Sequence, residues 1–378
     1  METISLLRCG AYDPDRLDEV IERHFAVLEK EGPLIRPGNR VAVKPNLLMA
    51  RPPEAATTTH PAFLAAVLRA VKRRGGIPVI AESPGGPYTK FSLKNIYAVT
   101  GVEAMAKKEG VLLNYDLGSG ERPTEEAEYC RAFPMITPVL QADVVISVAK
   151  LKTHCMTNYS GAVKNLFGVV PGLTKPEFHC RFPEKAAFGG MLVDLCQAVR
   201  PTVSFIDGIV GMEGNGPSGG KPRQLGLTAA ARNPHALDLL VSRLIGMEPD
   251  EIPTLRDAVA RGLCPADVGA LEVVGDRAES FLCEFEKPES RTTDFIRNVR
   301  MPAFLSRPLT RLMTPRPVIR RGQCVGCGKC AESCPQHTIA IRDRKAYIAY
   351  DRCIRCFCCH EMCPQKAIDI HRFRLFGL

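Results

Sequence analysis

Two copies of one cysteine pattern constrain this chain more than any other feature. The spacing in each copy is C-x2-C-x2-C-x3-C, and a proline follows the fourth cysteine. The first copy consists of Cys324, Cys327, Cys330 and Cys334. The second copy consists of Cys353, Cys356, Cys359 and Cys363. Nine of the sixteen cysteines fall in this short stretch, and thiols so closely spaced indicate a bound metal rather than disulfides.

The spacing and the trailing prolines are those of bacterial ferredoxins, in which the fourth cysteine of each copy ligates the other of two [4Fe–4S] clusters. We therefore predict that the first cluster is held by Cys324, Cys327, Cys330 and Cys363. The second cluster is predicted to be held by Cys353, Cys356, Cys359 and Cys334. The alternative is two zinc knuckles, but zinc sites usually pair short C-x2-C units rather than two triplets. Clusters of this kind store electrons and relay them.

The chain has 378 residues, which suits two or three domains. Residues 1–290 alternate short β-branched runs with helical patterns, which predicts an α/β domain with a mostly parallel sheet covered on both faces. Strands are expected at residues 40–44, 77–81, 111–115, 142–148, 202–206, 224–230 and 271–274. Helices are expected at residues 15–31, 61–74, 94–109, 186–199, 234–245 and 254–261. Residues 322–378 are predicted to form a small α+β domain like a two-cluster ferredoxin.

The stretch between these domains is basic. Residues 291–321 contain eight arginines, four prolines and a single acidic residue, Asp294. This composition predicts a solvated linker with one short helix, and the alternative is a docking strip for an acidic redox partner or an anionic surface. The net charge of +9 favours anionic partners but is too scattered to predict nucleic-acid binding. We expect no signal peptide and no transmembrane segment, and hence a cytoplasmic location.

Polar segments follow several predicted strands, which is where α/β proteins place ligands. Lys44 and Asn46 end the first of these strands. Thr59 and His60 precede a predicted helix, whose free N–H groups could bind an anion; a plain N-cap is the alternative. We predict that all four of these residues bind substrate.

The densest segment is residues 149–168, where three lysines, a histidine and the asparagine next to the last lysine follow a strongly apolar strand. These residues are Lys150, Lys152, His154, Lys164 and Asn165. Because a solvated loop does not need this composition, we predict an anion-binding or catalytic role rather than a bland basic loop. The lysines and Asn165 would hold a carboxylate or phosphate, and His154 and Lys164 would be catalytic. A nearby lysine would lower the pKa of His154, whereas a carboxylate would raise it.

The last segment, residues 207–217, contains Asp207 and Glu213 among several glycines. Asp207 is predicted to bind substrate and Glu213 to be catalytic, and either could ligate a metal. No G-x-G-x-x-G opens a helix here, and no Walker motif occurs in the chain. A nicotinamide cofactor or a nucleotide is therefore not supported.

The N-terminal segments together resemble the family called domain of unknown function 362. The resemblance rests on Lys-Pro-Asn-Leu at 44–47, Thr-Thr-Thr-His-Pro at 57–61, Leu-Lys-Thr-His at 151–154, Gly-Ala-Val-Lys-Asn-Leu-Phe-Gly at 161–168 and Asp-Gly-Ile-Val-Gly-Met-Glu-Gly-Asn-Gly-Pro at 207–217. A later element, Asn-Pro-His-Ala-Leu-Asp at 233–238, has asparagine where the family has aspartate. The resemblance covers roughly residues 1–290, and many members resemble this chain in carrying a ferredoxin tail. It implies the domain layout and the loops that matter, but no substrate.

Three functions remain open from the sequence. The first is a ferredoxin-coupled oxidoreductase, which exchanges electrons with a soluble donor or acceptor and acts on an anionic small molecule. The second is an electron-transfer or assembly subunit, whose N-terminal domain docks a redox partner. The third is a non-redox enzyme with structural or regulatory clusters. We predict the first.

Overall fold

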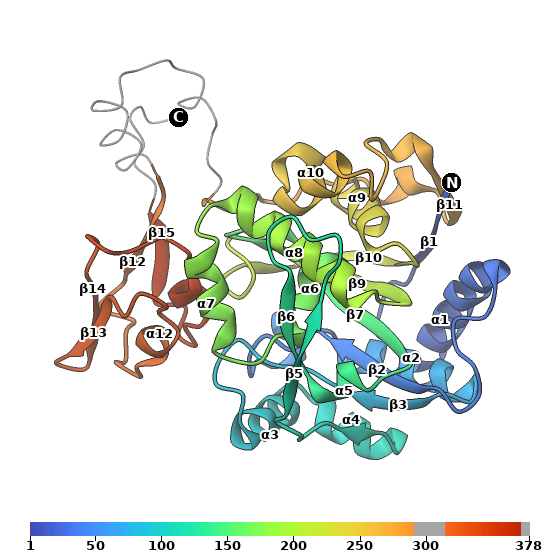
Figure 1. The fold of residues 1–378 in the computed structure, drawn as a ribbon, viewed down its shortest axis with the longest axis horizontal. Coiled ribbons are helices and arrows are strands. Elements are labelled where there is room, and N and C mark those ends of the chain that lie inside the picture. The colour runs from blue at the N-terminus through green and yellow to red at the C-terminus, as the bar shows by residue number, and fades with distance from the viewer. Residues whose placement is uncertain (291–313, 372–378) are drawn as a thin grey trace.

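A nine-stranded sheet is the frame of the N-terminal domain (Figure 1). The computed structural model describes residues 1–290 and 314–371. The strands of the sheet are β1 (Glu2–Arg8), β2 (Arg40–Pro45), β3 (Ile77–Ile80), β4 (Leu112–Leu113), β7 (Val144–His154), β8 (Asn158–Ser160), β9 (Val203–Glu213), β10 (Lys221–Ala231) and β11 (Leu271–Gly275). Their order is β11-β1-β10-β9-β7-β2-β3-β4, and β8 pairs with β7.

The sheet is mostly parallel, as predicted. Strands β9, β7, β2, β3 and β4 run parallel to their neighbours in that order, and β1 is parallel to β11. The antiparallel pairs are β1 with β10, β10 with β9, and β7 with β8. A separate hairpin is formed by β5 (Ser119–Pro123) and β6 (Ala132–Ile136).

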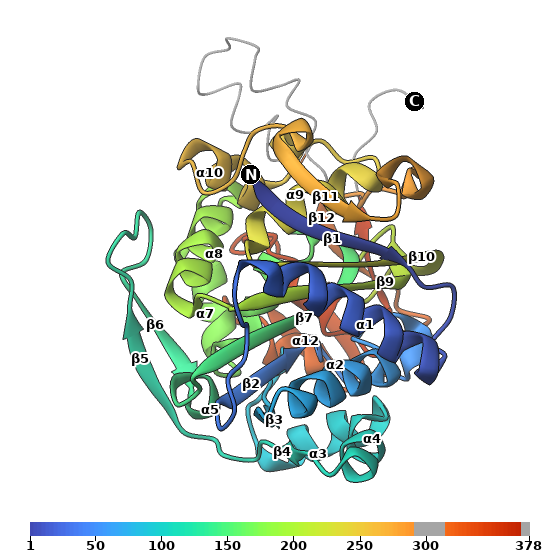
Figure 2. The ribbon, with the colours of Figure 1, turned by 90° about the vertical axis from the view of Figure 1, so that its right-hand side faces the viewer.

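Helices cover both faces of the sheet, which confirms the predicted α/β class (Figures 1 and 2). One face is covered by α1 (Pro14–Leu28), α2 (Pro61–Arg73), α3 (Lys90–Val99) and α4 (Val102–Glu109). The other carries α6 (Ala162–Asn165), α8 (Lys185–Val199), α9 (Pro234–Leu244) and α10 (Pro253–Ala260). The side chains of β2 alternate accordingly: Val41 and Val43 pack with α1 and α2, whereas Ala42 packs with α8.

Two further α-helices lie in the described part of the N-terminal domain. They are α5 (Thr137–Leu140) and α7 (Thr174–Arg181). The helix predicted at residues 94–109 is in fact two helices, because Gly101 has a φ of +74° and ends one helical run before α4 begins.

The C-terminal unit consists of two antiparallel strand pairs and two single-turn helices. Its elements are β12 (Arg316–Ile319), α12 (Lys329–Glu332), β13 (Ile339–Arg342), β14 (Lys345–Ile348), α13 (Cys358–Glu361) and β15 (Ile368–His371). β12 pairs with β15, and β13 pairs with β14. β12 lies inside the segment 291–321 predicted as linker, where its short, proline-containing sequence gives no strand pattern. Residues 291–313 of that predicted linker lie outside the described residues.

The C-terminal unit lies beside α7 at one end of the N-terminal domain (Figure 1). Within the two described ranges, no helix has the length and apolar character needed to cross a bilayer.

Candidate functional site

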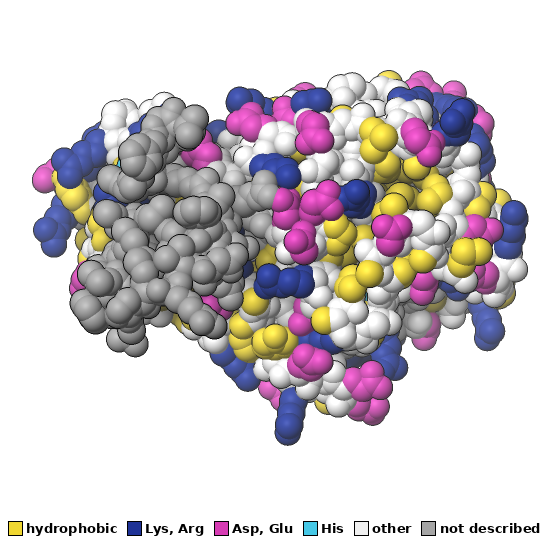
Figure 3. All heavy atoms as spheres, turned by 90° about the horizontal axis from the view of Figure 1, so that it is seen from above, with side chains coloured by type: hydrophobic (Ala, Val, Ile, Leu, Met, Phe, Trp, Pro, Cys, Tyr) yellow, Lys and Arg dark blue, Asp and Glu magenta, His cyan; other side chains and the backbone are white. Residues whose placement is uncertain are grey.

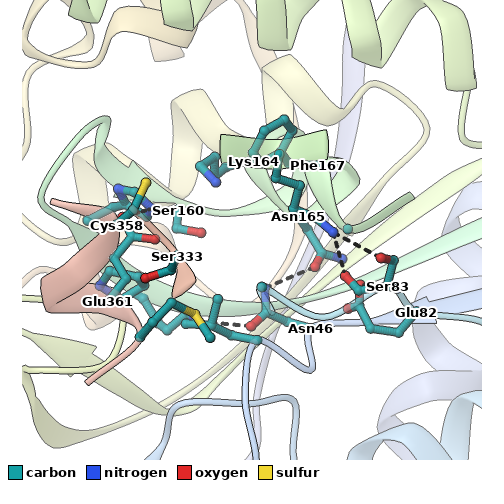
Figure 4. A pocket seen from close by; sticks show the side chains of 18 of the residues that line it. Asn46, Glu82, Ser83, Ser160, Lys164, Asn165, Phe167, Ser333, Cys358 and Glu361 are labelled. Carbon is teal, nitrogen blue, oxygen red and sulfur yellow. Dashed lines mark hydrogen bonds and ion pairs between the residues drawn. The ribbon is translucent and has the colours of Figure 1, made fainter. Parts of the chain in front are cut away.

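A pocket lies between the two units, and both of them contribute to its wall (Figure 4). It holds about 680 Å³ of space, its open mouth included. The N-terminal domain contributes several of the predicted site residues, namely Lys44, Asn46, Lys152, His154, Lys164 and Asn165. The C-terminal unit contributes Ser333, Cys358, Glu361 and Met362. The site is therefore shared between units that are far apart in the sequence.

The back of the pocket is an ion pair between Lys44 and Glu82, and both side chains are almost fully buried. The Lys44 ammonium donates to Glu82 Oε2 at 2.8 Å, to the Pro45 carbonyl at 2.8 Å and to Asn165 Oδ1 at 3.0 Å. All three of its protons are thus used inside the protein. Gly168 makes this arrangement possible, because a Cβ there would lie 2.5 Å from the Lys44 Nζ atom. Lys44 therefore shapes the pocket and has no donor left for a ligand.

Lys152, on β7, is held differently. Its ammonium donates to Asn46 Oδ1 and to the Thr57 carbonyl, both at 2.8 Å, which leaves one proton uncommitted. Burial lowers the pKa of Lys152 to about 7, and the positive charge of Lys164 adds to the effect. Near neutral pH, Lys152 therefore exists in both protonation states, and an anion in the pocket would favour the charged one.

Lys164 is the cation most open to a ligand. It makes no hydrogen bond or ion pair with any described residue, and its Nζ atom lies 4.7 Å from the ring centroid of Phe167 and 5.9 Å from that of Phe188. Burial lowers its pKa, while Glu361 opposes that shift. Figure 4 shows the side chain directed into the cavity. Lys164 and the remaining proton of Lys152 are the donors that an anion would meet.

The position of Lys164 is fixed by the start of α6. Asp238 on α9 accepts hydrogen bonds from the backbone N–H groups of Ala162 at 2.7 Å and Val163 at 3.0 Å. Gly161 has no side chain because a Cβ there would collide with the Asp238 carboxylate and the Tyr159 hydroxyl. Two glycines of this segment thus permit close approaches. Gly161 makes room for the Asp238 carboxylate that fixes α6, and Gly168 makes room for the Lys44–Glu82 pair.

The tautomer of His154 follows from its contacts. Its Nδ1 atom accepts a hydrogen bond from the Met156 N–H at 3.0 Å, so the proton of the neutral ring is on Nε2. Burial holds the pKa of His154 well below its ordinary value, and Lys164 and Lys152 lower it further. The sequence left open whether a lysine would lower the pKa of His154 or a carboxylate would raise it. The lowering by the lysines dominates. His154 presents a neutral N–H group to the pocket.

Hydrogen bonds around α13 hold the C-terminal unit against the N-terminal domain. The Ser218 hydroxyl donates to the Glu361 carbonyl at 2.6 Å, and Arg51 donates to the Pro364 carbonyl at 2.9 Å. His360 is 3.0 Å from the Asn215 carbonyl through Nε2. An apolar cluster of Cys155, Phe357 and Ile370 spans the same boundary. These contacts set the Glu361 side chain opposite the lysines.

The cysteines of the two motifs surround two further cavities in the arrangement that crossed ligation requires. One cavity is lined by Cys324, Cys327, Cys330 and Cys363, together with apolar side chains. The other is lined by Cys334, Cys353, Cys356 and Cys359, together with Cys358. These are the two sets predicted from the spacing, so the residues fit two clusters, although the ligand assignment stays a prediction. All sixteen cysteines are free of disulfide bonds.

The backbone of each motif is shaped for close wrapping. Gly326 and Gly328 have φ values of +68° and +80°. At the equivalent places in the second motif, Arg355 and Phe357 have φ values of +56° and +62°, which is unusual for residues with a side chain. The same left-handed turns therefore occur in both copies, and a Cβ at Gly326 would lie 2.5 Å from the Arg344 carbonyl oxygen.

The cavity of the second cysteine set adjoins the pocket. Cys358 lines both of them, and Ser333 in the pocket wall directly precedes Cys334. The cavity of the first set shares no residue with the pocket, and its Cys327 is exposed to solvent. The two cysteine sets thus differ in position: one lies near the pocket and the other near the surface.

Three of the predicted site residues form a separate network. Lys150 donates to Asp207 Oδ2 at 3.0 Å and to the Tyr12 hydroxyl at 2.7 Å, and the same Asp207 oxygen accepts from the His60 N–H at 3.0 Å. The His60 ring stacks on Tyr12 with centroids 3.6 Å apart, and it caps α2. None of these residues lines the pocket.

Two further predicted residues also lie outside the pocket. The Thr59 hydroxyl links the Asn46 N–H to the Val148 carbonyl, at 2.8 and 2.7 Å. Glu213 pairs at 3.0 Å with Arg223 of the neighbouring strand β10. In the described ranges, no three His, Cys, Asp or Glu side chains lie close enough together to ligate one metal ion in common.

The polar segments were predicted to follow strands, and this prediction is wrong for two of them. Lys150, Lys152 and His154 lie within β7, and Asp207 lies within β9, because both strands run several residues further than predicted. The apolar pattern stops where the lysines begin, and buried lysines inside a strand are rare enough to suggest a turn.

Several pocket residues were not among the site residues predicted from the sequence. They are Glu82, Ser83, Ser160, Lys175, His179, Ser333, Cys358, Glu361 and Met362. Glu82 and Ser83 stand in a segment after a predicted strand, which could orient a ligand or equally form a tight turn. Glu361 fills a variable position of the cysteine motif, so no local pattern marks it.

Comparison with known proteins identifies both parts of the chain. Residues 41–243 match the profile of the family described as domain of unknown function (DUF362), and residues 316–364 match that of the 4Fe-4S dicluster domain. The C-terminal unit thus has the capacity for 4Fe–4S electron transfer. A thylakoid-associated protein of Synechocystis is 33% identical over 266 residues, which are 70% of this chain and 81% of that protein.

Two solved structures show weaker likeness. The lactate racemase apoprotein of Thermoanaerobacterium thermosaccharolyticum matches with a TM-score of 0.39 and 14% identity, over 61% of this chain and 54% of that one. A structural-genomics protein of Thermotoga maritima matches with a TM-score of 0.33 and 13% identity, over 54% of this chain and 52% of that one. The chain spans about half the length of each.

Proposed function

The chain belongs to the DUF362 family and ends in a 4Fe-4S dicluster domain, and from these premises we propose that it is an iron–sulfur oxidoreductase acting on a small anion. The observation that carries the proposal is the position of the pocket. Lys152, Lys164 and His154 form one wall, while the opposite wall includes Cys358, which also lines the cavity of the second cysteine set.

The charge distribution supports an anionic ligand. Lys44 and Lys175 also line the pocket, but each uses its ammonium protons on protein acceptors. Lys164 and Lys152 retain donors; the charge of Lys164 lowers the pKa of Lys152, and both lysines lower the pKa of His154. A carboxylate or phosphate between their ammonium groups would relieve that repulsion and make charge-assisted hydrogen bonds.

When bound, the clusters would supply and accept single electrons. The residues of the chain would do the rest. Lys164 and Lys152 would hold the anion, and the His154 N–H would donate a hydrogen bond to an oxygen of the substrate. Because the pKa of Lys152 is about 7, its ammonium can also release a proton at neutral pH. A reduction that needs both electrons and a proton is the chemistry this set supports.

A panel experiment tests the proposal. The holoprotein is reduced anaerobically and mixed with small carboxylates and phosphates that carry a carbonyl group or a double bond, and reoxidation is followed by visible absorbance. We expect reoxidation with members of one chemical class, together with formation of the reduced product. Replacing Lys164 with alanine should abolish the response at low concentration, while Lys221→Ala, which removes an exposed lysine that does not line the pocket, should not.

Reoxidation by no member of the panel, together with stable capture of one redox protein, would favour an electron-transfer subunit instead. Turnover that persists in a protein lacking clusters would favour a non-redox enzyme. The free state of all sixteen cysteines supports a reducing compartment, and we propose that the protein is cytoplasmic.

A further inference from the structure

The mouth of the first cysteine cavity opens on the surface of the C-terminal unit. Cys327 is exposed, and two apolar residues that line the same cavity are exposed beside it: Val325 by 51% and Ile341 by 38%. Val325 and Ile341 therefore form a small exposed apolar patch beside the predicted cluster ligand Cys327. The pocket described above is on the other side of this unit, next to the second cysteine set.

Basic side chains surround this mouth. They are Arg321, Arg342, Arg344 and Lys345, and all except the half-buried Lys345 are exposed. The acidic residues nearby are fewer: Asp343 lies between two of the arginines, and Glu332 is already paired with Lys329 at 3.2 Å. Figure 3 shows Lys and Arg side chains at the end of the molecule formed by the C-terminal unit. The surroundings of the mouth therefore carry an excess of positive charge.

Contacts within the unit hold these charges in place. Lys345 donates to the Cys324 carbonyl at 2.6 Å, and the Arg321 guanidinium lies 4.7 Å from the ring centroid of Tyr347. The Arg344 backbone oxygen lies against Gly326, so the turn between β13 and β14 is packed onto the first cysteine loop. The basic side chains thus project from a rigid frame around Cys327.

We propose that this surface, formed by Val325, Cys327 and Ile341 with the rim Arg321, Arg342, Arg344 and Lys345, is the docking face for a small acidic electron-transfer protein. The inference rests on the electron-transfer capacity of the unit and names the partner of the proposed oxidoreductase. Redox proteins meet through small interfaces, in which complementary charge speeds the encounter and a few apolar contacts exclude water. An acidic protein matches the rim, and its cofactor would approach the exposed end of the unit rather than the pocket.

Binding to a defined probe tests the proposal without catalysis. The full-length holoprotein is titrated calorimetrically with an oxidised plant-type [2Fe–2S] ferredoxin, chosen for its net negative charge, at about 0.01 M and about 1 M ionic strength. We expect the double variant Arg342→Glu/Arg344→Glu to bind about tenfold or more weakly at low salt, and the difference to vanish at high salt. The control variant Lys107→Glu/Lys108→Glu makes the same change of net charge on α4, where both lysines are exposed, and should bind as the parent does.

Kinetics supply the second readout. Reduction of the holoprotein by reduced ferredoxin should slow at low salt in the arginine variant by a similar factor and recover at about 1 M ionic strength, while dithionite should still reduce its clusters fully. An equal loss in the α4 control, no ferredoxin binding by the parent, or a loss that persists at about 1 M ionic strength would each overturn the proposal. So would tighter, rim-dependent binding to duplex DNA. Because no substrate is present, these failures leave the proposal for the pocket untouched.

Discussion

The Nε2 atom of His154 lies 3.4 Å from Oε1 of Glu361, so the end of β7 meets helix α13 of the second cysteine motif. Since Nδ1 of His154 accepts a backbone hydrogen bond, it is the Nε2–H group that faces this carboxyl. Burial raises the pKa of Glu361, and the nearby Lys164 opposes that shift. One titratable group from each unit therefore meets at the pocket, and neither unit alone completes the site.

The first prediction concerns Lys164. Removing its uncommitted ammonium in Lys164→Ala should raise the KM for the anionic substrate about 10- to 100-fold, because a charge-assisted hydrogen bond contributes roughly 1.5–3 kcal/mol. Steady-state kinetics measure the change, and Lys164→Arg should recover part of it. An unchanged KM in Lys164→Ala would show that the anion is bound elsewhere.

Proton uptake is the second prediction. The pKa of Lys152 is about 7 in the free protein, and a bound anion should raise it. Below pH 6 the ammonium is charged in both states, so binding should take up no proton; near pH 8 it should take up nearly one. The affinity should accordingly weaken as the pH rises above 7, by up to about tenfold per unit.

Calorimetry of anion binding in two buffers with different ionisation enthalpies measures this uptake. The Lys152→Met variant serves as control, since it should bind weakly and without uptake. The pKa of His154 lies well below this range, so that residue should not contribute. Uptake that persists in Lys152→Met would assign the proton to another group.

Local chemistry made part of this structure predictable. The cysteine spacing specified a dicluster domain because crossed ligation imposes it. Helices with strong end signals were also found, such as α9, where Asn233 caps the first turn and Pro234 occupies it. In the pocket, Lys44, Lys152 and Lys164 were recognised because cations after apolar strands are chemically conspicuous.

The other features of the site depend on contacts between segments that are far apart in the sequence. Glu213 was grouped with His154 because both follow apolar strands, yet β9 extends to Glu213 and pairs there with β10, which directs the carboxylate to Arg223. Lys150 and Lys152 are two positions apart, but the pairing of β7 with β9 shifts register between them, and only Lys152 reaches the pocket. Glu361 comes from the other unit, and its place depends on how the units dock.

The buried ion pair behind the pocket gives the third prediction. Glu82→Gln should lower the free energy of unfolding by about 3–5 kcal/mol, because it leaves the Lys44 ammonium buried without a counter-charge. Urea unfolding measures the loss. The double variant Glu82→Gln/Lys44→Met should lose less than the sum of the two single variants, which shows that the pair is coupled.

An exposed ion pair provides the comparison for that experiment. Lys221 and Glu286 are 3.1 Å apart, but their side chains are 73% and 55% exposed, so Glu286→Gln should cost less than about 1 kcal/mol. Equal losses at the buried and exposed pairs would contradict the account of Lys44 given above.

The fourth prediction separates ligand cysteines from their neighbour. Cys356 and Cys358 are both buried and lie two positions apart, yet only Cys356 belongs to the repeated spacing. Cys356→Ser should lose about half of the bound iron, since one of two four-iron clusters loses a ligand. Cys358→Ser should keep all of it. In Cys356→Ser, electron delivery to the pocket should fail even though the remaining cluster is still reduced. Iron analysis and anaerobic reoxidation measure both effects, whereas loss of iron in Cys358→Ser alone, or zinc in place of iron, would refute the ligand assignment.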